Sequence, residues 1–250
     1  MGPSQDTASR LMEELAQAER LVALTGAGMS TESGLPDFRS QQGLWRQYRP
    51  EELASVDALT ARPLLFYEFY RKRLEMLDSV SPNPGHEALA ELERQGRLRL
   101  IVTQNVDGLH IAAGSRNVAE IHGSLRRARC HRCGRAHAPE VLRQPIPDFD
   151  SLPRCACGGL IRPDVVLFGE MLPQRAFARA VEAVETCNAL LVVGSSLQVY
   201  PAASLPRIAL ERGARLWIIN LEPTPYDDDA DIVVRGKAAE VLRLLVPGQD

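Results

Sequence analysis

Three polar segments of the sequence carry residue types that could bind a nucleotide and move a proton. The first is rich in small residues: Gly26, Ala27, Gly28 and Thr31 follow a short apolar run. Small residues let backbone N–H groups approach a phosphate, and the start of a helix adds positive potential. The third glycine of the usual dinucleotide fingerprint is missing, so a tight turn between a strand and a helix remains an open interpretation.

The same segment continues with Asp37, Phe38 and Arg39, after a loop that contains glycine and proline. The guanidinium of Arg39 can hold a phosphate with two N–H groups, and the ring of Phe38 can shield a flat heterocycle. An acid, an aromatic ring and an arginine side by side are unusual for packing alone. The combination favours nucleotide binding.

The second segment is Gln104, Asn105, Val106 and Asp107, directly after an apolar run at residues 98–102. Ligands of open α/β sheets bind beyond the carboxyl ends of the strands, where polar side chains need a use. An Asx-type turn could employ Asn105 or Asp107, but hardly both together with Gln104. We therefore favour a functional interpretation.

The third segment holds His122, which is followed by a glycine that leaves its ring uncovered. An imidazole has a pKa near operating pH and suits a general base. His110 is expected to be a hydrogen-bonded helix residue, and His86 to stand at a helix start.

Four of the five cysteines form two close pairs, Cys130 with Cys133 and Cys155 with Cys157. Such pairs predict a zinc site made of four thiolates, with no open position for a catalytic water. His131 or His137 could replace one thiolate. Cys187 stands in an apolar context and is expected to be a small buried residue.

These segments need a scaffold that brings them together. Apolar runs predict strands at residues 21–24, 98–102, 189–193, 215–219 and 231–234. Helical spacing predicts helices at residues 9–19, 85–95, 174–187, 202–212 and 237–245. The alternation predicts an α/β fold with a doubly wound, parallel, Rossmann-like sheet.

Two stretches break the alternation, and together they predict a smaller second domain made of two insertions. Residues 40–80 are expected to form a helical insertion and residues 124–162 a zinc-binding one. The Rossmann-like domain then comprises residues 1–39, 81–123 and 163–250.

The bulk composition narrows the function classes. The chain has 250 residues, with 29 Lys and Arg against 32 Asp and Glu, which predicts no nucleic-acid surface. We find neither an apolar run of membrane length nor a signal peptide at the N-terminus. We expect a cytoplasmic monomer without membrane contact, in a compartment where paired cysteines hold metal rather than form disulfides.

The three segments together resemble the sirtuin (Sir2) family of NAD-dependent protein deacylases, bacterial type. The resemblance rests on residues 26–39, 104–107 and 122–123 and extends from about residue 10 to residue 247. It implies NAD as co-substrate and one structural zinc ion. It also implies that Val106 and Asp107 hold the nicotinamide amide, Gln104 contacts the ribose, and Asn105 positions groups near the reacting carbon.

The resemblance extends to residues that follow later strands. The expected contacts to phosphate, adenine ribose and adenine are Gly194, Ser195, Ser196, Asn220, Glu222 and Ala238. The expected peptide-binding strand, to which an extended substrate would add itself, includes Val165, Val166, Phe168 and Gly169.

The chemistry implied by the family begins when the carbonyl oxygen of an acyl-lysine attacks the ribose and nicotinamide leaves. His122 then acts as general base on a ribose hydroxyl, and the acyl group ends on ADP-ribose. The alternative is ADP-ribosyl transfer, in which a protein nucleophile captures the same ribose. Intact His122 and Asn105 favour deacylation.

A pair on the helix after residue 63 bears on the acyl group. Tyr70 and Arg73 resemble the sirtuin branch that removes succinyl and malonyl groups, and Ala54 fits a roomier acyl pocket. Alternatively, Tyr70 belongs to an apolar stripe and Arg73 to the surface. Residues 199–203 and 220–228 are closer to bacterial deacetylases, so we expect activity on both acetyl and acidic acyl groups.

Overall fold

The computed structural model describes residues 5–37 and 49–244, and its larger sheet has six parallel strands. Their order is β3-β2-β1-β7-β8-β9. Their bounds are β1 Leu21–Thr25, β2 Leu98–Thr103, β3 Val118–Glu120, β7 Ala189–Val193, β8 Arg215–Asn220 and β9 Ile232–Arg235. The five predicted strands are confirmed. The short edge strand β3 was not predicted, because three residues are too few for a pattern.

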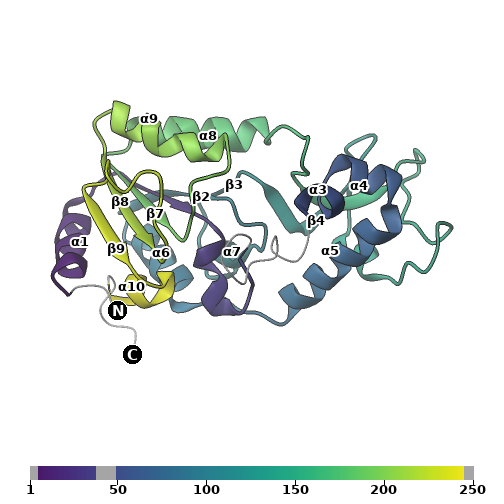
Figure 1. Cartoon of the computed structure of the whole chain (residues 1–250), viewed down its shortest axis with the longest axis horizontal. Coiled ribbons are helices and arrows are strands. Elements are labelled where there is room, and N and C mark those ends of the chain that lie inside the picture. Colours follow the sequence, from purple (N-terminus) through teal and green to yellow (C-terminus); the bar gives the residue numbers. More distant parts are fainter. Residues whose placement is uncertain (1–4, 38–48, 245–250) are drawn as a thin grey trace.

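Helices cover both faces of this sheet, which is why the central strands β1 and β7 are buried at every position. One face packs against α1 (Gln5–Gln17), α6 (Pro84–Arg94) and α10 (Ala238–Leu244), and the other against α8 (Gln174–Thr186) and α9 (Leu205–Glu211). In β1, Leu21 and Ala23 join the first core, while Val22 and Leu24 join the second. Figure 1 shows α8 and α9 on one side of the sheet, with α6 and α10 on the other.

The strand order places β1 between β2 and β7, where the chain changes direction across the sheet. Ligands of doubly wound folds bind at this point, beyond the carboxyl ends of the strands. The loops that follow β1, β2 and β7 carry the glycine-rich segment, the Gln104–Asp107 segment and residues 194–196. The topology thus collects at one edge what the sequence spreads over 170 residues.

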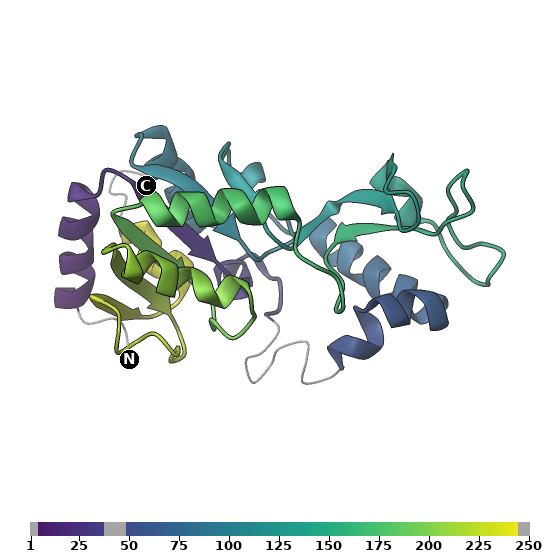
Figure 2. The ribbon, with the colours of Figure 1, turned by 90° about the horizontal axis from the view of Figure 1, so that it is seen from above.

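The remaining elements form a second body with its own core. It contains the helices α3 (Pro50–Leu53), α4 (Val56–Ala61) and α5 (Pro63–Asp78), and the strands β4 (Gly123–Cys130), β5 (Ala136–His137) and β6 (Ile161–Val165). The strands make an antiparallel sheet in the order β5-β4-β6. Figures 1 and 2 place this body at the end of the molecule opposite α1. The sequence predicted its helices but not its sheet.

Within residues 5–37 and 49–244, no helix combines the length and the apolar character needed to cross a membrane.

Candidate active site

A cleft of about 1230 Å³ opens beyond the carboxyl ends of the parallel strands. It is lined by most residues that the sequence predicted for NAD: Gly26, Ala27, Gly28, Thr31, Asp37, Gln104, Val106, Gly194, Ser195, Ser196, Asn220, Glu222 and Ala238. All the residues that the sequence predicted for catalysis or for substrate binding also line it: Asn105, His122, Ala54, Tyr70, Arg73, Val165, Val166, Phe168 and Gly169. Phe38 and Arg39 lie outside the described residues.

Close backbone contact explains the glycines at the floor of the cleft. Gly28 N donates to Gly194 O at 2.9 Å, so the loop after β1 touches the loop after β7. A Cβ atom on Gly26 would lie 2.7 Å from Gly194 O, and one on Gly194 would lie 2.3 Å from Met29 N. Gly194 also has a φ of +61°, a left-handed conformation that side chains disfavour. Any larger residue would push the two loops apart.

Asn105 is buried beside these glycines, and its amide group is fixed by two hydrogen bonds. Nδ2 donates to Gly26 O at 3.0 Å and to Ser30 Oγ at 3.1 Å. Both amide hydrogens are therefore used, and Oδ1 is the atom that can meet a ligand. This geometry suits a residue that orients a group in the cleft.

Asp107 differs from its neighbours, because it lines a small adjoining cavity of about 40 Å³ rather than the main cleft. Its carboxylate accepts from Ser30 Oγ at 2.8 Å and from Leu109 N at 2.9 Å. The second bond is the Asx-type turn that the sequence left open. The same carboxylate thus closes a turn and faces a cavity that Asn105 and Val106 also line.

His122 has one ring nitrogen fixed by the backbone. Nδ1 lies 2.9 Å from Gln104 O, and a carbonyl oxygen only accepts, so Nδ1 carries the hydrogen. Burial lowers the pKa of His122, and the bond to Gln104 O opposes this only in part. The ring is therefore neutral near pH 7, with the lone pair on Nε2, as a general base requires.

Two further histidines lie buried behind the site. His110 Nε2 is 2.9 Å from Thr25 Oγ1, and His86 accepts from Asn83 N in the first turn of α6 at 3.3 Å. Burial lowers the pKa of His86 to about 4 and that of His110 well below its ordinary value. Both positions match the structural roles predicted for them.

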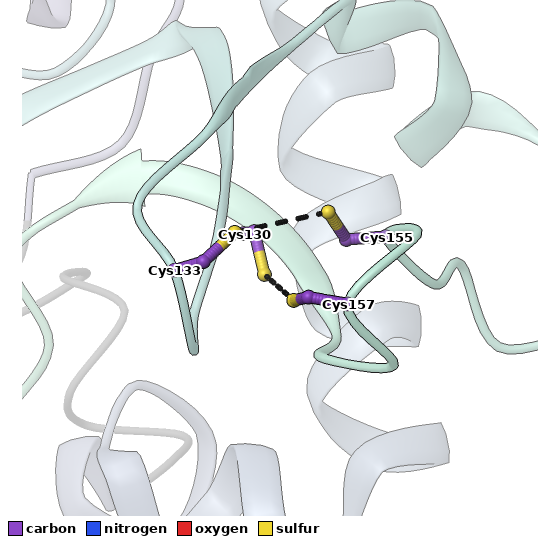
Figure 3. A group of neighbouring side chains, drawn as sticks. All are labelled: Cys130, Cys133, Cys155 and Cys157. Atoms are coloured by element: carbon purple, nitrogen blue, oxygen red, sulfur yellow. Dashed lines mark hydrogen bonds between the residues drawn. The ribbon is translucent and has the colours of Figure 1, made fainter.

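The four paired cysteines converge in the second body, where Cys130 ends β4 (Figure 3). Their sulfur atoms all lie within 4.8 Å of one another, with 3.5 Å between Cys130 and Cys157 and 3.8 Å between Cys133 and Cys155. A tetrahedral zinc ion with Zn–S bonds of about 2.3 Å needs sulfurs roughly 3.8 Å apart. The backbone N–H of Cys133 lowers the pKa of Cys130 to about 6, which favours the thiolate. The set fits a closed structural zinc site, with the spacing of one residue in the second pair.

Comparison with known proteins identifies the family. Residues 26–201 match the model of the Sir2 family. The chain belongs to this family. It is 51% identical to NAD-dependent protein deacylase 2 of Pyrobaculum aerophilum, over 93% of this chain and 92% of that one. It is 52% identical to NAD-dependent protein deacetylase 1 of Geobacillus kaustophilus, over 92% and 94%.

Solved structures of Sir2 proteins share the whole architecture. A Sir2 homologue in complex with NAD superposes with a TM-score of 0.89 at 47% identity, over 98% of this chain and 93% of that one. A Sir2 protein with a p53 peptide and NAD gives 0.83 at 36% identity, over 94% and 95%. The fold and the cleft are therefore those of a sirtuin.

In this Sir2 family member, Tyr70 and Arg73 meet both interpretations that the sequence left open. Tyr70 is 2% exposed and its ring centroid lies 4.6 Å from that of Phe66, yet Tyr70 borders the cleft. Burial raises its pKa to about 12, so it stays protonated. Cζ of Arg73 lies 5.7 Å from the centroid of the Phe69 ring, and Arg73 lines both the cleft and the small cavity. One helix face thus supplies core and cleft wall together.

Sequence reasoning missed several lining residues as site residues: Glu32, Leu167, Glu170, Met171, Leu172, Gln174, Phe177, Val199, Tyr200, Pro201, Leu221 and Gly236. Leu167, Glu170 and Leu221 adjoin predicted positions, which was the available signal. Glu32 is informative, because its Oε2 accepts from Ala239 N at 2.6 Å and joins the glycine-rich loop to α10. Nothing local in the sequence indicates a contact over 207 residues.

Proposed function

We propose that this protein removes acyl groups from protein lysines with NAD as co-substrate and releases nicotinamide and O-acyl-ADP-ribose. The observation that carries the proposal is that Asn105 and His122 line the same cleft as the glycine-rich loop. The deacylase and deacetylase names of relatives about half identical, and solved Sir2 complexes with NAD and with ADP-ribose, support it.

Each proposed role follows from a fixed atom. Bound NAD supplies the ribose carbon at which the acyl oxygen displaces nicotinamide. Oδ1 of Asn105 is the atom free to orient groups near that carbon, because Nδ2 is committed to Gly26 and Ser30. Nε2 of His122 then takes the proton of a ribose hydroxyl, since Nδ1 is held by Gln104 O. The zinc site, with four ligands and no open position, takes no part in these steps.

The roles in NAD binding are proposed from where each residue lies in the cleft or in the small cavity. Asp107 and Val106 line the small cavity and would hold the nicotinamide amide. The other predicted lining residues would hold phosphates, riboses and adenine along the cleft. Phe38 and Arg39 keep the roles that the sequence predicts.

The test is mass spectrometry of an acetyl-lysine peptide incubated with the protein, with and without NAD. Loss of the acetyl group only with NAD, together with nicotinamide release that depends on the acetyl group, supports deacylation. A peptide that gains ADP-ribose and keeps its acetyl group would instead support ADP-ribosyl transfer.

We further propose that Tyr70 and Arg73 admit succinyl and malonyl groups beside acetyl. Their hydroxyl and guanidinium groups border the cleft and could pair with a distal carboxylate, and Ala54 leaves room beside them.

We also propose how the chain divides into domains, where it acts and in what oligomeric state. We infer one NAD-binding domain with two insertions, because the two bodies have separate cores. The sequence predicts residues 1–39, 81–123 and 163–250 for this domain and 40–80 and 124–162 for the insertions, whereas Val165 and Leu167 pack in the core of the second body. We infer a cytoplasmic protein without nucleic-acid partners, because two metal-type cysteine pairs indicate a reducing compartment and the net charge is only −3, and we propose that it acts as a monomer.

A further inference from the structure

Arg162 is an arginine without solvent contact inside the second body. It is 0% exposed and lies on β6, beside the cleft. Its Nη1 donates to Val165 O at 2.6 Å, and its Nη2 pairs with Glu170. Its Nε has no partner among the described residues. A buried ion pair is weak support for stability, because removing both charges from water costs much of what their attraction returns.

Glu170 extends this contact to the backbone of the peptide-binding segment. While one carboxylate oxygen faces Arg162, Oε2 accepts from Leu167 N at 3.0 Å. Gly169 turns the chain between them with a φ of +93°. Arg162 and Glu170 therefore fix the backbone of this segment at two points, Val165 O and Leu167 N.

The held segment touches both parts of the active site. Val166 N donates to His122 O at 2.9 Å, and Phe168 N donates to Ala54 O at 2.9 Å. Val165 through Glu170 all line the cleft. A change in the path of this segment would displace the backbone groups that meet an extended substrate. The glycine-rich loop would stay in place, because it follows β1 and is hydrogen-bonded to the end of β7.

We propose that the Arg162–Glu170 pair is a positioning device for the acyl-peptide, which sets the path of residues 165–170 and so controls peptide affinity but not NAD affinity. The inference rests on the proposed function, because it assigns the occupant of residues 165–170. Both side chains act through the backbone they hold.

The experiment compares Glu170→Ala and Glu170→Gln with wild type on one acetyl-lysine peptide. We expect Glu170→Ala to raise the peptide KM about tenfold, as loss of a hydrogen bond to a charged group implies, while the KM for NAD changes less than twofold. Glu170→Gln keeps one acceptor oxygen and should have a smaller effect in the same direction. Arg143→Met is the matched control, because Arg143 pairs with Asp78 on the surface of the same body, neither residue lines the cleft, and both KM values should stay unchanged.

Two outcomes would overturn the proposal: an unchanged peptide KM in Glu170→Ala, or an equal rise of both KM values. Melting temperatures show whether each variant is folded, and Glu170→Gln serves if Glu170→Ala is not. Absence of turnover in the wild type would count against the proposed function alone, because peptide affinity is also measured by fluorescence anisotropy.

Discussion

The two bodies of the molecule are stabilised in different ways, and the active site lies where they meet. The parallel sheet has strands such as β1 and β7 that are buried at every position, between two apolar cores. The second body has a smaller antiparallel sheet, a cluster of four cysteines and a buried ion pair. The first body is stabilised by two apolar cores, one on each face of its sheet, whereas the second combines a single apolar core with a predicted metal site, as a small unit often needs.

Each body contributes a different part of the active-site cleft. The parallel sheet contributes the loops that fit a nucleotide, and their glycines allow backbone to touch backbone at Gly28 and Gly194. The second body contributes cleft walls from α5 and from the segment after β6, where we propose that the acyl-peptide binds. Changes in each body should therefore have separable effects.

The largest expected effect is on the chemical step at the boundary. His122→Ala should lower kcat about a thousandfold, because a positioned base contributes on that scale, while the Kd for NAD stays within twofold. Steady-state kinetics and calorimetric NAD titration measure the two. His137→Ala, in the antiparallel sheet away from the cleft, is the control and should keep its kcat. Wild-type turnover in His122→Ala would remove His122 from the mechanism.

The next effect is on the second body alone. Cys155→Ser should release zinc and lower Tm by roughly 10 °C, because the loss of several kcal/mol lowers Tm by about 2–4 °C per kcal/mol in a protein of this size. Calorimetry and metal analysis test this. Cys187→Ser is matched in chemistry, since its buried thiol donates only to Val184 O, and it should change Tm little. A zinc-free protein with unchanged Tm would show that the ion is dispensable for the fold.

Acid should weaken the parallel-sheet body through His86. Its pKa is about 4 in the folded chain against an ordinary value of 6.5, so between these values the unfolded state binds more protons. Stability is therefore complete above pH 6.5 and falls as pH drops towards 4. At pH 5 the free energy of unfolding should be lower by about 2 kcal/mol from this group.

Urea unfolding at pH 7 and pH 5 measures the loss. His86→Gln should show a smaller difference between the two pH values, because its amide does not titrate in this range. Comparing the two proteins cancels the acid sensitivity of the thiolates and of His110, which both share. Equal losses would mean that His86 does not keep its lowered pKa.

The smallest effect separates acyl groups. Arg73→Met should reduce kcat/KM for a succinyl-lysine peptide about tenfold or more, because the charged pair with the distal carboxylate is lost, and should change the acetyl rate little. Arg71→Met, on the same helix but paired with Glu75 at the surface, controls for loss of charge. Equal losses on both peptides would return Arg73 to a structural role.

The sequence by itself determined the parallel sheet and the four cysteines that fit zinc, and its choice of His122 over four other histidines stays a prediction. Each of these depends on a short-range pattern: a run of apolar residues, a following glycine, or two cysteine pairs. Such patterns can be recognised without knowledge of the fold, because each lies within one short segment of the chain.

Only the tertiary structure decided how distant segments meet. It brought Gly26 and Gly28 against Gly194, gave Asp107 a separate cavity, and made Tyr70 both a core residue and a cleft wall. It also added β3 and the antiparallel sheet, whose strands are too short or too polar to predict from pattern. The contacts of Arg162 with Glu170 and of Glu32 with Ala239 depend on where chain crossings place backbone groups, and no local spacing encodes that position.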